Sequence, residues 1–209
     1  MAYIGQAPAN KPVEGSDISS TVITGQTALS TAPADTDEFL ISDAGVLKRL
    51  DASLVGGGGI TEADQWRLTA NKTDSSDITA NLERNDSTGF GYIGTGMTES
   101  SGIFSFPSTG IYLVETTGSF EAIPDDSVNL IINVTTDNGS YTEVAKGLTA
   151  GDGSSTGFGS STTSFYFDVT NVSTHKVKFS TSSISSGTSL MGNSTMNFTY
   201  FNFIRLGDT

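Results

Sequence analysis

The chain has 209 residues, no cysteine and a formal net charge of −13, from 10 lysines and arginines against 23 aspartates and glutamates. The lack of cysteine excludes disulfides and thiolate metal sites, and the negative charge argues against phosphate-backbone partners and anionic membranes. No run of residues is long and apolar enough to span a membrane, and the first residues lack the basic and apolar regions of a secretory signal. We therefore expect neither a nucleic-acid partner nor membrane insertion.

Residues 1–60 differ in composition from the rest. They contain three of the five prolines, and their short apolar patches are separated by polar spacers. Such a segment cannot bury a core of its own, so we expect an extended arm that becomes ordered by lying on another protein. Residues 31–50 within it predict two short strands around a Ser42–Gly45 turn. The glycines at 56–59 form the clearest linker, so we assign the arm to 1–60 and a head domain to 61–209.

The first element of the head is predicted to be a short helix. Thr61 can cap a helix, and Asp64 three residues later completes a pattern similar to a capping box. Trp66 is the only tryptophan in the chain. We expect it to seal one end of the domain as a core or interface side chain.

Residues 102–113 predict two strands that meet at a corner. Two short apolar runs flank the sequence Pro107–Gly110. Proline cannot donate to a ladder and therefore ends a strand, and glycine can adopt the positive φ that closes such a turn. The aromatic residues on either side then point inward, and we expect Phe106, Tyr112 and, from a later strand, Phe167 in the core.

Much of the remaining head alternates between apolar and polar residues with a period of two, which is typical of half-buried strands. Turn signals rich in Asp, Asn and Gly separate these segments. Short strands at this spacing predict an all-β sandwich. The expected apolar faces are Leu130, Ile132 and Val134; Phe165, Phe167 and Val169; and Val177 and Phe179.

The last strand, residues 198–206, has apolar side chains on both faces. One face can fill the core of a single chain. The other needs a partner, because an exposed aromatic stripe promotes association. We therefore predict an oligomer in which Tyr200, Phe201 and Phe203 pack against neighbouring copies.

The segments 102–113 and 198–206 resemble strands of the trimeric jelly-roll family that includes tumour necrosis factor and the globular heads of the complement first component. The resemblance covers roughly residues 61–209. It implies a jelly-roll β-sandwich and a homotrimer whose closing strand lies near the threefold axis. Residues 31–50 and the opening Met1–Gly5 resemble parts of tail-fibre and virion proteins of marine bacteriophages. That second resemblance implies that the arm attaches to another virion protein, of the capsid or the tail.

No residue pattern points to catalysis. His175 is the only histidine, and one imidazole supports neither a Ser-His-Asp triad nor a histidine metal site. The glycines of 89–96 lack the Lys-Ser/Thr pair and the helix of a nucleotide-binding loop. We interpret the acidic turns as solvated and expect no metal or other cofactor; calcium is the one ion that their oxygens suggest. These turns contain Asp35, Asp37 and Glu38; Asp125 and Asp126; and Asp152.

Together these features predict a non-enzymatic bacteriophage structural protein, made in the bacterial host cytoplasm and carried on the virion surface. It would form a homotrimeric knob attached through residues 1–60. One placement is a tail fibre or receptor-binding tip that contacts a host-surface glycan or protein, and the other is a capsid decoration or head fibre. A secreted or cell-surface carbohydrate-binding module is the alternative, which the missing secretory signal disfavours. A glycan hydrolase would need a catalytic carboxylate pair that is not recognisable here.

Overall fold

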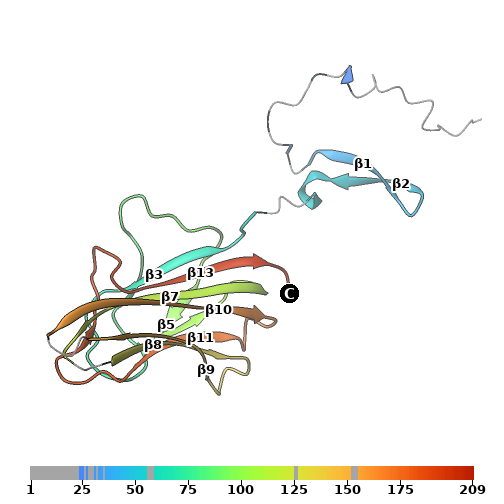
Figure 1. The fold of residues 1–209 in the computed structure, drawn as a ribbon. Coiled ribbons are helices and arrows are strands. Elements are labelled where there is room, and N and C mark those ends of the chain that lie inside the picture. Colours follow the sequence, from blue (N-terminus) through green and yellow to red (C-terminus); the bar gives the residue numbers. More distant parts are fainter. Residues whose placement is uncertain are drawn as a thin grey trace, which may run out of the picture. The chain divides into compact units, whose positions relative to one another are not determined.

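The computed structural model describes residues 24–25, 27, 31, 33–34, 36–55, 59–124, 127–151 and 155–209. The chain divides into two compact units, Met1–Gly58 and Gly59–Thr209 (Figure 1). The regular structure is almost entirely antiparallel β, which confirms the predicted fold class. No helix among the described residues is long and apolar enough to cross a membrane. Some features of the sequence analysis lie outside the described residues, namely Met1–Gly5, Asp35, Asp125-Asp126 and Asp152.

The first unit contains a hairpin of strands β1 (Glu38–Asp43) and β2 (Val46–Asp51), at the place where the sequence predicts two short strands. Ala44 and Gly45 connect them with φ values of 51° and 82°. Two successive positive φ values belong to a type I′ turn, whose twist matches that of paired strands. None of the side chains described in this unit is buried. A two-stranded hairpin without a core is marginally stable in water.

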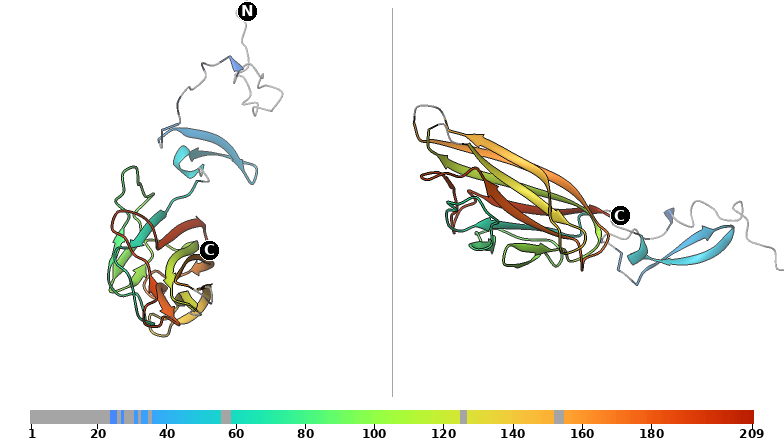
Figure 2. Two further views of the ribbon diagram at one scale, coloured as in Figure 1. Left: turned by 60° about the vertical axis from the view of Figure 1, so that its left-hand side comes forward. Right: turned by 90° about the horizontal axis from the view of Figure 1, so that it is seen from below.

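The second unit, the head, is a sandwich of two antiparallel sheets (Figure 1 and Figure 2). Sheet I has the order β10-β7-β13-β3-β4, with β12 beside β7, and sheet II has the order β5-β6-β11-β8-β9. The chain changes sheet repeatedly, so strands that are neighbours in a sheet come from distant parts of the sequence. The strands are β3 (Ala63–Leu68), β4 (Leu82–Arg84), β5 (Thr98–Ser100), β6 (Ile103–Ser105), β7 (Gly110–Ala122), β8 (Ser127–Thr135), β9 (Thr142–Ala150), β10 (Gly157–Val169), β11 (Lys176–Ser182), β12 (Ser189–Leu190) and β13 (Tyr200–Gly207).

The Pro107–Gly110 corner carries the chain from β6 in sheet II to β7 in sheet I. Gly110 has a φ of 143°, and a Cβ on it would lie 2.5 Å from the carbonyl oxygen of Gly207. Glycine is therefore required here both by the backbone conformation and by the close approach of β13. The Tyr112 hydroxyl donates to the Ser108 carbonyl oxygen at 3.1 Å, which ties the corner to the strand that follows it.

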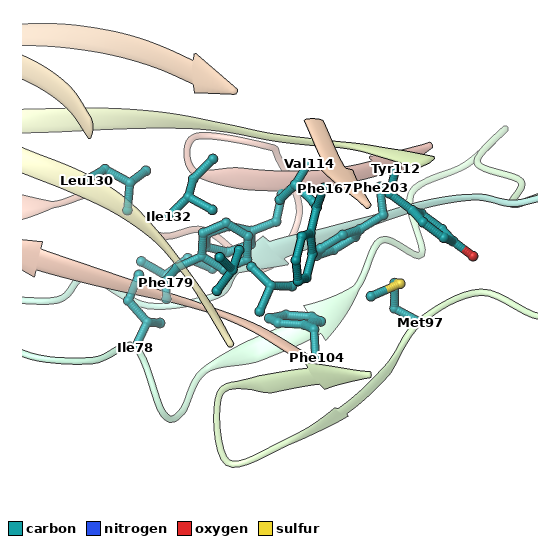
Figure 3. Close-up of a cluster of buried hydrophobic side chains, with 14 of the residues drawn as sticks. Ile78, Met97, Phe104, Tyr112, Val114, Leu130, Ile132, Phe167, Phe179 and Phe203 are labelled. Atoms are coloured by element: carbon teal, nitrogen blue, oxygen red, sulfur yellow. The ribbon is translucent and has the colours of Figure 1, made fainter. Parts of the chain in front are cut away.

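The core between the sheets is aromatic (Figure 3). Phe104 from sheet II is fully buried, and its ring lies 5.4 Å from Trp66, 5.7 Å from Phe179 and 5.1 Å from Phe203 between ring centroids. A second aromatic group lies near the corner, where Phe106 packs 4.7 Å from Tyr112 and 5.6 Å from Phe167. Truncating one such ring to alanine typically costs about 3–5 kcal/mol, so these residues make large contributions to the stability of the head.

The helix predicted for residues 61–68 is wrong, because this segment forms strand β3. Its backbone pairs on one side with β13, with Arg67 opposite Tyr200 and Ala63 opposite Ile204, and on the other side with β4. The two neighbours supply the hydrogen bonds that a helix would make within itself. Trp66 is half-buried against Phe104 in the body of the sandwich rather than sealing an end.

Candidate interaction face

The closing strand β13 has an inner and an outer face, and the structure assigns them differently from the prediction. Phe201 and Phe203 are 0% and 1% exposed and pack inside the sandwich, with Phe201 at 4.3 Å from the Phe179 ring. Side chains buried in their own chain cannot contact a neighbouring copy, so the prediction of an interface role for these two residues is wrong. Tyr200 lies on the opposite, outer face, which it shares with Asn202 and Ile204.

The outer face of sheet I carries a row of apolar side chains. Residues that pair across antiparallel strands project to the same face, and the register places Tyr166 beside Leu113, Leu113 beside Ile204, and Ile204 beside Ala63. We call these four residues the apolar row; they come from β10, β7, β13 and β3, which lie side by side in Figure 1. Tyr166 is 67% exposed, and the other three are half-buried.

The next row on this face is polar and hydrogen-bonded from strand to strand. The Gln65 side-chain amide donates to Asn202 Oδ1 at 2.7 Å, and Asn202 Nδ2 donates to Glu115 Oε1 at 3.0 Å. Asn85 and Asn197 both donate to Gln65 Oε1, at 2.7 and 2.6 Å. Each amide donates to the next residue, and the last acceptor is the carboxylate of Glu115. This row is therefore polar and ordered by hydrogen bonds, in contrast to the apolar row.

A buried arginine organises the loops at the β3 edge of the face. Arg67 has a fully buried side chain, and its guanidinium donates to Glu83 Oε1 at 2.7 Å and to the Ser87 hydroxyl at 2.8 Å. It also donates to the Asp86 carboxylate and the Ser194 carbonyl oxygen. Because the donors of one side chain reach residues of two different loops, Arg67 holds both loops against the sheet.

The loop from residue 85 to 97 overhangs β3 and creates a groove of about 400 Å³ on the outer face. We call it the Phe90 groove. Ala63 and Ile204 of the apolar row and the amides Gln65 and Asn202 belong to its lining, which connects it directly to the two rows described above. The complete lining is Ala63, Asp64, Gln65, Gly89, Phe90, Gly91, Asn202 and Ile204.

Cation–π contacts and hydrogen bonds fix this loop in place. The Arg84 guanidinium lies 5.1 Å from the centre of the Trp66 ring and 4.9 Å from that of Tyr92, so it is in cation–π contact with both. Glu62 Oε2 accepts hydrogen bonds from the backbone N–H groups of Thr95 and Gly96 at 2.9 and 3.0 Å. A carboxylate thus occupies the amide donors that a phosphate would use, which argues against an anion site in this glycine-rich loop.

The geometry supports neither a functional role for His175 nor a metal site among the described residues. His175 is 8% exposed, stacks on Phe167 at 5.6 Å, and has a threonine hydroxyl beside each ring nitrogen. These contacts are those of a packed structural side chain. In the part of the chain that the structure describes, no three His, Asp or Glu residues gather as a metal site would require. The acidic turns at Asp125-Asp126 and Asp152 lie outside that part.

Sequence reasoning assigned Tyr200 to an interface, and the structure places it on the outer face of β13, where that role stays a prediction. The other features of this face were missed. Such reasoning considered the glycines of 89–96 only as a nucleotide-binding loop, and nothing in a single sequence places a loop over an earlier strand. The alternation of Ala63, Gln65 and Arg67 with Asp64, Trp66 and Leu68 is the one signal that identifies β3 as a two-faced strand.

No protein-family model matches the chain, and no curated protein matches it in sequence. Solved structures do match its fold. They include murine APRIL, which is 11% identical and aligns over 69% of this chain and 98% of that one with a TM-score of 0.52. They also include Eiger TNF from S. frugiperda, which is 13% identical and aligns over 72% of this chain and 96% of that one with a TM-score of 0.55. At such identity the likeness establishes the fold, and the head is a TNF-like jelly roll.

Proposed function

We propose that the protein is a non-enzymatic structural protein whose heads assemble into a homotrimer through the outer face of sheet I. The observation that carries this proposal is the apolar row, in which four apolar side chains from four strands lie together on a surface that one chain leaves uncovered. A contiguous apolar patch of this kind marks an interaction site. The resemblance of the closing strand to the trimeric jelly-roll family favours three copies.

The solution mass tests this assembly directly. Light scattering coupled to size exclusion should give three times the 21.7 kDa of one chain. Leu113→Asp puts a charge in the middle of the apolar row, so we expect a monomer with an unchanged β-sheet spectrum. Leu148→Asp is the matched control, because Leu148 is 63% exposed on sheet II. A wild-type monomer would contradict the proposal, and so would a Leu113→Asp trimer of undiminished stability.

We propose further that the head is displayed on a bacteriophage virion and attached through residues 1–60. The support is the resemblance of residues 31–50 and Met1–Gly5 to virion proteins, together with a hairpin whose described side chains are all at least partly exposed. An arm without a core needs a surface on which to order. The head would then act either as a receptor-binding tip on a tail fibre or as a capsid decoration.

Immunogold labelling of intact particles separates these placements. Label over the capsid means decoration or a head fibre, and label confined to the tail means a role in host attachment. Weak sites on three linked heads would then gain avidity for a repetitive host surface. Particles without label would refute the virion assignment and leave the assembly of the head as a separate question.

A carbohydrate-binding module is the second candidate, and the Phe90 groove is the observation that favours it. Amides such as those of Gln65 and Asn202 hydrogen-bond sugar hydroxyls, and the Phe90 ring offers an apolar surface beside them. Binding to a glycan array that Asn202→Ala abolishes would support this function. An array without a hit for the wild-type head would contradict it.

A further inference from the structure

We propose that Tyr166 of one copy inserts into the Phe90 groove of the next copy, so that each interface of the trimer joins a knob to a hole. The inference rests on the proposed homotrimer and adds which side chains specify its geometry. Tyr166 is the most exposed member of the apolar row, at 67%. The Phe90 groove, with a volume of about 400 Å³, is large enough for an aromatic side chain.

The knob and the hole lie at opposite ends of one row. Tyr166 is on β10, the edge strand of sheet I, and the groove borders β3 and β13 near the other edge. The row runs from Tyr166 through Leu113 and Ile204 to Ala63, and the last two line the groove. Knob and hole therefore sit at the same height along the strands.

This arrangement suits a closed ring. A contact between two different patches of identical chains is heterologous, and repeating it produces either a ring or an open filament. Rotation about an axis parallel to the strands does not change the position of a residue along that axis. Tyr166 of one copy can therefore meet the groove of the next copy only if both lie at the same position along the strands. The common row of Tyr166 and the groove satisfies that condition, which favours closure over a filament.

The chemistry of the groove matches a tyrosine. Ala63 and Ile204 supply an apolar floor for the ring, and Phe90 supplies an aromatic wall. Asn202 Oδ1 accepts one hydrogen bond from Gln65 and keeps a second lone pair for a phenol hydroxyl. Tyrosine combines an apolar body with one polar tip, which is the combination that this lining can satisfy.

The groove is also fixed before a partner arrives. Arg84 holds the overhanging loop through the carboxylate of Asp64 and the ring of Tyr92, and Glu62 holds its backbone at Thr95 and Gly96. Rigid parts lose little conformational freedom on binding. The loop therefore acts as a preformed wall, and the knob has only its own rotamers to order.

Cysteine pairing tests the contact, because the chain has no cysteine of its own. We would replace Tyr166 and Phe90 together by cysteine in the full chain. Within one copy the strand of the groove nearest to Tyr166 is β13, two strand spacings or about 10 Å from β10, and a disulfide needs Cα atoms within about 7 Å. Any bridge must then join different copies, and a non-reducing denaturing gel should show covalent dimers and trimers. The control pair Leu148→Cys with Phe90→Cys should stay monomeric on the same gel.

The outcomes separate this inference from the proposed trimer. A double variant that is trimeric by light scattering but forms no bridge between the cysteines introduced at positions 166 and 90 overturns the knob-and-hole contact and leaves the trimer standing. A monomeric wild type contradicts both.

Dilution measurements give a second test that needs no cysteine. We expect Tyr166→Ala to raise the trimer dissociation midpoint at least about tenfold, as for an anchoring aromatic. Tyr166→Phe should recover most of that loss if the ring supplies the main contact. Leu148→Ala, which removes a similarly exposed apolar side chain from sheet II, should change nothing. An unchanged midpoint for Tyr166→Ala would overturn the contact.

Discussion

Asp64 and Arg84 form an ion pair between β3 and β4, in which Arg84 Nε lies 3.0 and 3.1 Å from the two carboxylate oxygens and Nη2 lies 3.0 Å from Oδ2. The Asp64 side chain is 2% exposed and also accepts hydrogen bonds from Trp66 Nε1 at 2.9 Å and from the Met97 backbone N–H at 2.8 Å. One buried carboxylate thus joins β3, β4 and the end of the loop that covers the Phe90 groove.

The Asp64→Asn substitution should destabilise the head by about 3 kcal/mol, because it leaves the partly buried Arg84 without its counter-charge. Urea unfolding followed by circular dichroism measures this loss. Glu143→Gln is the control, since Glu143 pairs with Lys146 at 3.2 Å on the surface. An exposed pair contributes less than about 1 kcal/mol. Equal effects of the two substitutions would show that burial does not decide the importance of the Asp64 pair.

Tyr112 should give the head an alkaline limit. Burial raises the pKa of its hydroxyl above the ordinary value of 10.0, with a further contribution from the charge of Glu62. A raised pKa means that the folded state holds the proton more tightly than the unfolded state. The resulting stability is complete below about pH 10 and disappears as the pH rises through the folded value. Tyr112→Phe should remove a late step from the ultraviolet titration of tyrosinate and flatten the alkaline loss of stability. A titration curve identical to that of the wild type would contradict this assignment.

Asp137 should contribute an acid limit at the turn after β8. Its pKa lies below the ordinary value of 3.8, because its Oδ1 accepts hydrogen bonds from the Thr135 hydroxyl at 2.7 Å and from the backbone N–H groups of Gly139 and Ser140 at 2.8 Å each. A lowered pKa stabilises the fold above about pH 3.8, and the stabilisation is lost as the pH falls through the folded value. Asp137→Asn should therefore be less stable than the wild type near about pH 6 and approach it near about pH 3. A stability difference that stays constant with pH would refute the role of ionisation.

The sandwich itself was predictable because its strands alternate. Phe165 and Phe167 point inward and Tyr166 outward, as period two requires. Strand β3 was not predicted, because Thr61 and Asp64 at its beginning match the residue pattern of a helix cap. The carboxylate of Asp64 is buried, and its charge is tolerated because Arg84 on the neighbouring strand pairs with it and Trp66 and Met97 donate hydrogen bonds to it.

The sequence of β13 does not show which of its two faces is buried. Alternation divides Phe201 and Phe203 from Tyr200 and Ile204, but both groups are apolar, so period alone leaves their sides undetermined. The register resolves it, because Phe203 pairs with the fully buried Val114 of β7. The Phe90 groove depends on tertiary packing in the same way, since it forms where a loop crosses a strand from an earlier part of the chain.

The two faces of β13 lead to opposite expectations for the same substitution. Phe201→Asp places an unpaired carboxylate in the aromatic core, where Phe201 is 0% exposed, so we expect it to abolish folding of the head. Ile204→Asp places the charge on the outer face, where Ile204 is half-buried. It should leave the fold intact and dissociate the proposed trimer. Near-ultraviolet circular dichroism reports the packing of the core, and light scattering reports the mass. A folded, monomeric Phe201→Asp variant would mean that Phe201 contacts a partner after all, and would restore the interface role that its burial excludes.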